Sequence, residues 1–128
     1  MYSKKIDWSK KVGLMGHSMG GQATQNTAAD EEAVKKWNIG AAVALHPAYT
    51  NASVDPFVRE LPVQVPMFFG AGSSDYITWA SSVRNAYSKV KSGVPKVFAE
   101  IKGANHHEPT TGPNRWMPYV TSMFDCHI

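Results

Sequence analysis

The sequence predicts an α/β fold in which a mostly parallel sheet of about four strands is flanked by helices. Short apolar segments alternate along the chain with segments of helical pattern, which is typical of parallel strands joined by helical crossovers. Residues Ile39–Leu45 form a continuous apolar run, as expected for a strand buried on both faces of such a sheet. A Gly-x-Ser-x-Gly motif at residues 16–20 lies between the first expected strand and the first expected helix.

The first half of the chain contains two expected strands and one expected helix. Residues 12–15 form a short apolar segment that leads into the glycine motif. Residues 21–29 are rich in small side chains and favour a helix that packs closely beneath the motif. Residues 30–37 are mostly charged, and we expect a helical turn or a loop on the surface there. The strand at residues 39–45 ends at His46-Pro47.

The second half continues the alternation. Residues 63–72 predict a further buried strand, which ends before Ser73-Ser74-Asp75. Residues 78–90 predict an amphipathic helix, and residues 115–124 predict a final helix. Between them, residues 96–101 alternate polar and apolar side chains, which is typical of a strand at or near a sheet edge. The apolar face expected for the helix at 78–90 consists of Trp79, Val83, Ala86, Tyr87 and Val90.

The bulk composition indicates one globular unit, and we treat residues 1–128 as a single domain. The chain has 128 residues, of which 43% are hydrophobic. No apolar run approaches the ~20 residues needed to cross a bilayer, and no signal peptide is expected. The net charge is +3, and the lysines are scattered without interleaved aromatic residues. No nucleic-acid partner is therefore expected.

The glycine motif indicates a nucleophilic serine. A serine on a very sharp strand-to-helix turn has its hydroxyl lifted clear of the sheet. Side chains two residues before and two residues after Ser18 are expected to collide across the turn, which explains Gly16 and Gly20. The backbone N–H of Met19 would then face the oxyanion that forms on a substrate.

Ser18, Asp75 and His106 each come shortly after an expected strand. Because the carboxyl ends of parallel strands meet at one edge of the sheet, we expect these side chains to lie close together. A serine hydroxyl needs a base, normally histidine, and the base needs a third group that fixes its tautomer and stabilises its charged form. The three residues therefore fit the roles of nucleophile, acid and base.

Each of these assignments has an alternative. Asp75 also lies where an ordinary turn aspartate is common, and Asp55 is a rival acid in a proline-flanked loop. His107 competes with His106 for the role of base. The adjacent histidines could suggest a metal site, but no cysteines or carboxylates at ligand spacing accompany them, so we expect none.

Two further histidines are candidate substrate-binding residues. His17 is expected to point away from Ser18 and to pack or hydrogen-bond behind the turn rather than act as the base. His46, at the end of a strand, is expected either to line the pocket or to cap the strand.

Three segments together carry a family resemblance: residues 16–21 (GHSMGG), 65–75 (VPMFFGAGSSD) and 103–106 (GANH). They resemble α/β-hydrolases of the cutinase-like and dienelactone-hydrolase-like serine esterase group, which includes polyester hydrolases and lipases. The order nucleophile, acid, histidine is that of the α/β-hydrolases. The resemblance extends from about residue 7 to residue 126 and implies an α/β-hydrolase fold.

The resemblance also implies roles for single residues. The family places its histidine after Gly-Ala-x, which selects His106 over His107, and its chemistry requires no metal or organic cofactor. It implies the Met19 N–H as one oxyanion donor and matches Tyr49 to an aromatic residue that lines the acyl pocket. From the sequence, Cys126 is either a free surface thiol or half of a disulfide with a partner outside this chain. Secreted members frequently carry a late cysteine paired further downstream, which Cys126 would match in an oxidising compartment.

Few residues precede Ser18, whereas members of this fold begin with further strands and helices. The chain therefore resembles the C-terminal half of the domain and lacks the loop that supplies the second oxyanion donor. The strand before Ser18 is expected to present an open, apolar edge. We expect a missing N-terminal half or a second chain to cover that edge.

The expected function is hydrolysis of a carboxylic ester, small or polymeric, through an acyl-enzyme. A lactone, thioester or peptide is the alternative substrate, because acyl-transfer machinery does not identify its leaving group. Outside the enzymes, the alternative is a non-catalytic module of the same fold that serves binding or assembly.

Overall fold

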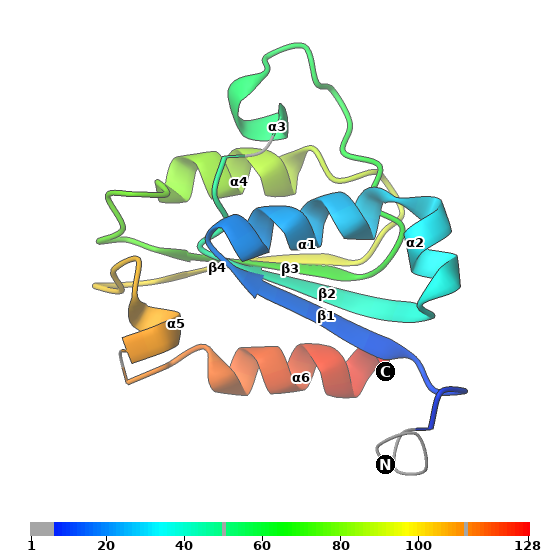
Figure 1. Ribbon diagram of the computed structural model, residues 1–128. Helices are drawn as coiled ribbons and strands as arrows, with labels where there is room; N and C mark the ends of the chain where they lie inside the picture. The colour runs from blue at the N-terminus through cyan, green and yellow to red at the C-terminus, as the bar shows by residue number, and fades with distance from the viewer. Residues whose placement is uncertain (1–6, 50, 112) are drawn as a thin grey trace.

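The computed structural model describes residues 7–49, 51–111 and 113–128 (Figure 1). The described residues form one sheet of four strands: β1 (Val12–His17), β2 (Ile39–Leu45), β3 (Met67–Gly72) and β4 (Lys96–Ile101). The strands lie in the order β1-β2-β3-β4, and every neighbouring pair is parallel. The prediction of a parallel α/β sheet is confirmed.

Helices cover both faces of this sheet (Figure 1). Helices α1 (Met19–Ala29) and α4 (Ala80–Ser88) lie on one face, and α6 (Met117–His127) lies on the other. Helices α2 (Glu31–Lys36), α3 (Asn51–Val54) and α5 (Glu108–Thr111) are short segments within the connections. Strand β2 contributes to both layers, because alternate side chains point to opposite faces. Ala42 and Ala44 belong to one core cluster, whereas Val43 and Leu45 belong to the other with Trp116.

Strand β3 begins at Met67 and not at residue 63, so the expected strand was too long. Pro66 has no N–H to donate to a strand neighbour. The N–H of Gln64 donates over 2.8 Å to a carbonyl in the last turn of α1. Val63 and Val65 are nevertheless buried. The apolar pattern of this segment therefore reports burial in the core rather than strand pairing.

Helix α4 is shorter than the expected helix at residues 78–90. Val83, Ala86 and Val90 are buried as expected, but Trp79 is 53% exposed, so its place on the buried face is wrong. Trp79 precedes the helix in an extended conformation (φ −59°, ψ 136°). The helical period does not apply there, and the indole ring projects into solvent.

Strands β1 and β4 are the two edges of the sheet. The edge position was expected for residues 96–101. Strand β1 pairs with β2, and no strand of the described ranges lies on its other side. Val12 and Met15 are 44% and 53% exposed there. At the same edge, Trp8 and Trp37 help to line an apolar hollow of about 530 Å³.

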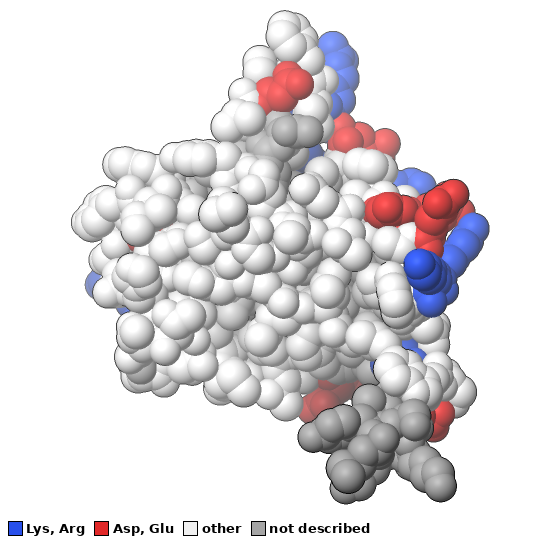
Figure 2. Space-filling model, in the orientation of Figure 1, with Lys and Arg blue, Asp and Glu red and all other residues white. Residues whose placement is uncertain are grey.

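Charged side chains are unevenly distributed over the face drawn in Figure 2. They gather around α2 and near α3, whereas the left end, toward which the strands run, carries few of them in this view. Within the described ranges, no helix combines the length and the apolar character needed to cross a membrane.

Candidate active site

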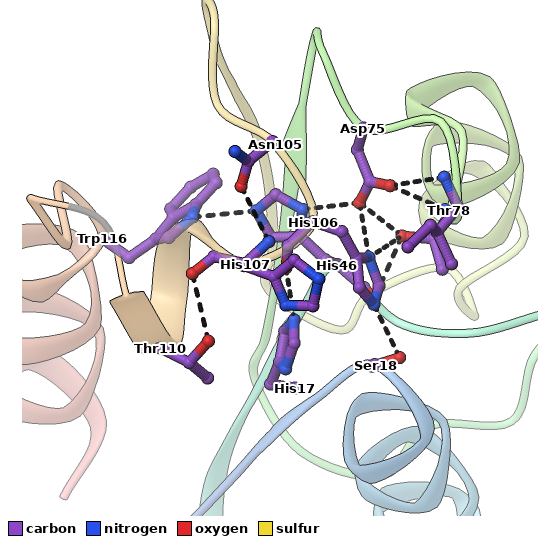
Figure 3. Close-up of polar contacts among 11 residues, drawn as sticks. His17, Ser18, His46, Asp75, Thr78, Asn105, His106, His107, Thr110 and Trp116 are labelled. Carbon is purple, nitrogen blue, oxygen red and sulfur yellow. Dashed lines mark hydrogen bonds and ion pairs between the residues drawn. The ribbon is translucent and has the colours of Figure 1, made fainter.

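Ser18 lies between β1 and α1 in a strained backbone conformation with φ 55° and ψ −120°. Residues other than glycine rarely adopt positive φ. The Ser18 carbonyl accepts hydrogen bonds from the N–H groups of Gln22 (3.0 Å) and Ala48 (2.9 Å), and its own N–H donates to Leu45 (3.1 Å). The turn is thus held by α1 and by the end of β2, and its hydroxyl points toward the loops that follow β3 and β4 (Figure 3).

The turn requires glycine at only one of the two expected positions. A Cβ atom on Gly16 would overlap the carbonyl of Gly20 and would lie 2.7 Å from the Thr24 hydroxyl. A Cβ atom on Gly20 would meet no other group within 4 Å. The steric explanation is therefore correct for Gly16 and wrong for Gly20.

The loops after β1, β3 and β4 bring Ser18, Asp75 and His106 into one hydrogen-bonded chain (Figure 3). The Ser18 Oγ atom lies 2.8 Å from His106 Nε2, and His106 Nδ1 lies 2.8 Å from Asp75 Oδ2. Asp75 and His106 are buried, whereas Ser18 is partly exposed. The acid and the imidazole are therefore shielded from water while the serine remains accessible.

The hydrogen-bond partners fix the proton positions in this chain. A carboxylate can only accept, so the His106 Nδ1 atom that faces Asp75 must carry a proton. In a neutral ring, Nε2 is then the acceptor for the Ser18 hydroxyl. This is the arrangement of a general base on a nucleophile.

Five donors surround the Asp75 carboxylate. Oδ1 accepts from the N–H groups of Ile77 and Thr78 at 2.8 Å each. Oδ2 accepts from the Thr78 hydroxyl and from His46 Nδ1, both at 2.7 Å, and from His106. Burial raises the pKa of Asp75, but hydrogen bonds from the Thr78 backbone, His106, His46 and the Thr78 hydroxyl together lower it far below its usual range. The carboxylate is therefore ionised.

His17 and His46 both have partners within the protein. His17 Nε2 lies 2.6 Å from the backbone carbonyl oxygen of His106, and the two imidazole rings have centroids 4.8 Å apart (Figure 3). Burial lowers the pKa of His17 despite this hydrogen bond. His46 is fully buried, with Nδ1 on Asp75 and Nε2 3.0 Å from the indole nitrogen of Trp116. His46 therefore lies beneath the surface at the end of β2, whereas one of the two expectations placed it in the pocket lining.

The other expected residues lie around this chain. Met19 opens α1, where the first N–H groups have no intrahelical acceptor. Tyr49 is 48% exposed and follows the residue whose N–H holds the Ser18 carbonyl. Asp55, the rival acid, accepts a hydrogen bond over 2.8 Å from the backbone N–H of Phe57 in its own loop and not from the cluster. His107 lies beside His106, with ring centroids 5.6 Å apart, and its side chain is exposed.

Two contributors were missed in the sequence. Thr78 follows Asp75 at the i+3 position, and an aspartate that accepts from the backbone two and three residues on is a recognisable local pattern. Trp116 reaches His46 across 70 residues of sequence, and no local pattern indicates that contact.

His46, Asp75 and His106 also form a group that could be considered for a metal ion, since their donor atoms lie within 4.8 Å of one another. Metal ligands need free lone pairs. Both Nδ1 atoms carry protons toward Asp75, while His46 Nε2 accepts from Trp116 and His106 Nε2 faces Ser18. Hydrogen bonding therefore accounts for the proximity of the three residues.

The fold is similar to that of solved α/β-hydrolases. A monoacylglycerol lipase of Paleococcus ferrophilus superposes with a TM-score of 0.66 at 18% identity, covering 91% of this chain and 69% of that one. A serine hydrolase involved in carbazole degradation, the CarC enzyme, superposes with a TM-score of 0.72 at 14% identity, covering 98% of this chain and 68% of that one.

The chain belongs to the PET hydrolase-like family, whose model matches residues 2–125. It is 30% identical over 112 residues to Cutinase 1 of Thermobifida cellulosilytica and, over the same length, to the cutinase of Thermobifida fusca. Both alignments cover 87% of this chain but 38% and 33% of the respective cutinases. The chain thus spans about a third of the length of each relative, and the resemblance to cutinase-like hydrolases is confirmed.

Proposed function

We propose that the chain carries the catalytic centre of a serine hydrolase that cleaves carboxylic esters through an acyl-enzyme. One observation carries this proposal: the unbroken hydrogen-bonded path from the Ser18 hydroxyl through His106 to the ionised Asp75. The cutinase relatives favour an ester as substrate. The scarcity of charge at this end of the molecule in Figure 2 suits a neutral one.

In the proposed reaction, Ser18 Oγ attacks the ester carbonyl carbon while His106 Nε2 accepts the hydroxyl proton. Asp75 holds the His106 Nδ1 proton and stabilises the imidazolium that forms. His106 then protonates the leaving alcohol, and the acyl group remains on Ser18. Water, deprotonated by His106, releases the acid. The Met19 N–H stabilises the oxyanion in both steps, and no cofactor takes part.

Tyr49 and His17 are the proposed substrate contacts. His17 lines a hollow of about 290 Å³ together with the apolar side chains of Met15, Leu45 and Met117. An apolar hollow with few polar groups suits the hydrocarbon part of an ester. Tyr49 is half-exposed on the loop after β2 and would contact the acyl group from the side of that loop.

We assign residues 1–128 to a larger α/β-hydrolase domain. The exposed apolar side chains along β1 and the hollow beside them would be covered by an N-terminal half or by a second chain. The same segment would supply the second oxyanion donor. Loss of one such donor costs on the order of 10²–10³ in rate, so the chain without that segment is expected to be a slow enzyme.

Labelling with a fluorophosphonate probe, followed by intact-mass analysis, tests the proposal. One adduct is expected on the wild-type chain, none on Ser18→Ala and one on Ser122→Ala, in which an exposed serine of α6 is removed as a matched control. Hydrolysis of p-nitrophenyl esters of increasing acyl length gives the second readout. A folded wild-type chain that takes no adduct would contradict the proposal, as would an adduct that persists in Ser18→Ala.

A further inference from the structure

We propose that His46 is a positioning residue for Asp75, held by the Trp116 indole in its neutral Nδ1–H form so that it always donates to the carboxylate that orients His106. The consequence for catalysis rests on the proposed function. The protonation state of His46 does not, because it follows from contacts among buried residues.

The indole of Trp116 fixes the tautomer of His46. Its Nε1–H lies 3.0 Å from His46 Nε2, and an indole nitrogen can only donate. His46 Nε2 must therefore present a lone pair, and the single ring proton lies on Nδ1. That atom is 2.7 Å from Asp75 Oδ2, which can only accept. A second proton on the ring would face the indole proton, so the cationic form requires this contact to break.

The His46 ring is held in place by its own backbone and by the strand beside it. His46 has φ 43°, and its N–H donates over 2.7 Å to the carbonyl of Gly70 in β3. A Cβ atom on Gly72 would overlap the carbonyl of Ala104 and would come within 2.8 Å of His46 Cε1, so glycine at this position makes room for the loop after β4 and for the ring. A residue keeps such a strained backbone conformation only where the surrounding structure holds it there.

The indole is fixed from the other side. Trp116 is fully buried, and the side chain of its neighbour Arg115 forms two hydrogen bonds with the Glu108 carboxylate at 2.8 and 3.2 Å. Arg115 also donates over 3.1 Å to the carbonyl of Lys102, just after β4. The segment that carries the indole is thus tied to α5 and to the loop that leads to His106.

A neutral His46 keeps the charge of Asp75 available to His106. The titratable groups that face His46 are Asp75, His106 and His17. The ring centroids of the two histidines each lie 6.0 Å from that of His46. Glu108, in α5, interacts with His46 electrostatically. Burial lowers the pKa of His46 more than its hydrogen bond to Asp75 raises it. A cationic His46 would neutralise Asp75 and repel the imidazolium that forms on His106 during the reaction.

Long-range ¹H–¹⁵N spectra of the histidine side chains test the protonation state directly. The wild-type chain contains five histidines, and the His46 signals are those lost in His46→Asn. From about pH 5 to about pH 8, where free histidine titrates, we expect His46 to keep one proton on Nδ1 and a lone pair on Nε2. A proton on Nε2 anywhere in this range would overturn the proposal, whether or not the chain hydrolyses esters.

The pH dependence of kcat/KM tests the catalytic consequence. In Trp116→Phe the lone pair of His46 is free to take a proton, so we expect the acidic decline of kcat/KM to begin about one pH unit higher than in the wild type. Above about pH 8 the variant should differ less than about threefold from the wild type. In the double variant His46→Asn/Trp116→Phe, the asparagine amide can still donate to Asp75 but cannot titrate, so the displaced decline should return toward the wild-type position. An unchanged profile in Trp116→Phe, or a displaced one that persists in the double variant, would contradict the positioning role.

Discussion

The carbonyl group of Gly20 occupies the space into which a side chain on Gly16 would project. This contact closes the turn that presents Ser18, because it joins the last part of β1 to the first turn of α1. The strained backbone of Ser18 lies between these two glycines, so the turn cannot widen at position 16 without moving the nucleophile.

The two glycines should respond differently to the same substitution. Gly16→Ala is expected to destabilise the chain by about 1–3 kcal/mol, as overpacking does, and to abolish fluorophosphonate labelling. Gly20→Ala adds a methyl group in open space on a helix and should be neutral or stabilising by up to about 1 kcal/mol. Urea unfolding of both variants measures the difference. Equal losses of stability would refute the explanation by overlap at position 16.

Replacement of Asp75 by asparagine should affect both activity and stability. An asparagine amide would point two N–H donors at a position where Thr78, His46 and His106 already donate, and it would leave His106 free to adopt the other tautomer. We expect kcat to fall by about 10³–10⁴ and the free energy of unfolding to fall by about 1–3 kcal/mol. Asp55→Asn, in the loop after α3, is the matched control and should retain wild-type kcat.

Stability should fall as the pH is lowered below about 6.5. Burial lowers the pKa values of His46 and His17 in the folded chain, so between the folded and unfolded pKa values of each ring only the unfolded chain binds the proton. The stability therefore rises with pH in this window and is lost on acidification. The lowered pKa of Asp75 adds a second loss below about pH 4, as the carboxylate becomes protonated.

Urea midpoints measured across this range can separate these contributions. His46→Asn should reduce the dependence between about pH 5 and pH 7 to the part that His17 contributes, whereas His107→Asn, which removes an exposed histidine, should leave the slope unchanged. If His46→Asn keeps the full wild-type slope above about pH 5, His46 is not responsible for it.

The open edge of β1 should promote self-association of the 14.0 kDa chain. Light scattering after size-exclusion chromatography is expected to show species larger than the monomer. Met15→Lys places a charge on the exposed edge and should shift the distribution toward the monomer. Phe57→Lys, which replaces an 86% exposed side chain outside the edge, should not. A monodisperse wild-type monomer would show that the edge needs no cover.

Local patterns predicted the elements that are defined by burial and turn chemistry. The apolar run of β2 and the alternating segment of β4 have the bounds expected from the sequence, because each is bordered by residues that end a strand. The segment before Met67 was misassigned because core burial and strand pairing leave the same apolar signal. Trp79 was misplaced because the helical period was extended beyond the N-terminal end of α4, which begins at Ala80.

The candidate site could be predicted in part for the same reason. Ser18, Asp75 and His106 each follow a strand, and the topology of a parallel sheet brings such positions together. The contact between His46 and Trp116 depends on how α6 packs across the sheet, and it joins residues 70 apart. Such a contact arises from tertiary packing and has no signature in either segment.

The order of the strands in the sheet is also their order along the chain. Each strand can therefore dock on the strand that was synthesised before it, with one helical crossover closed at a time, and such short-range closures favour rapid folding. The contact between Ser18 and His106 joins residues 88 apart and requires the last strand to be in place. During folding, the serine would thus acquire its base only when the sheet is complete, and a partly folded chain would carry an unactivated hydroxyl.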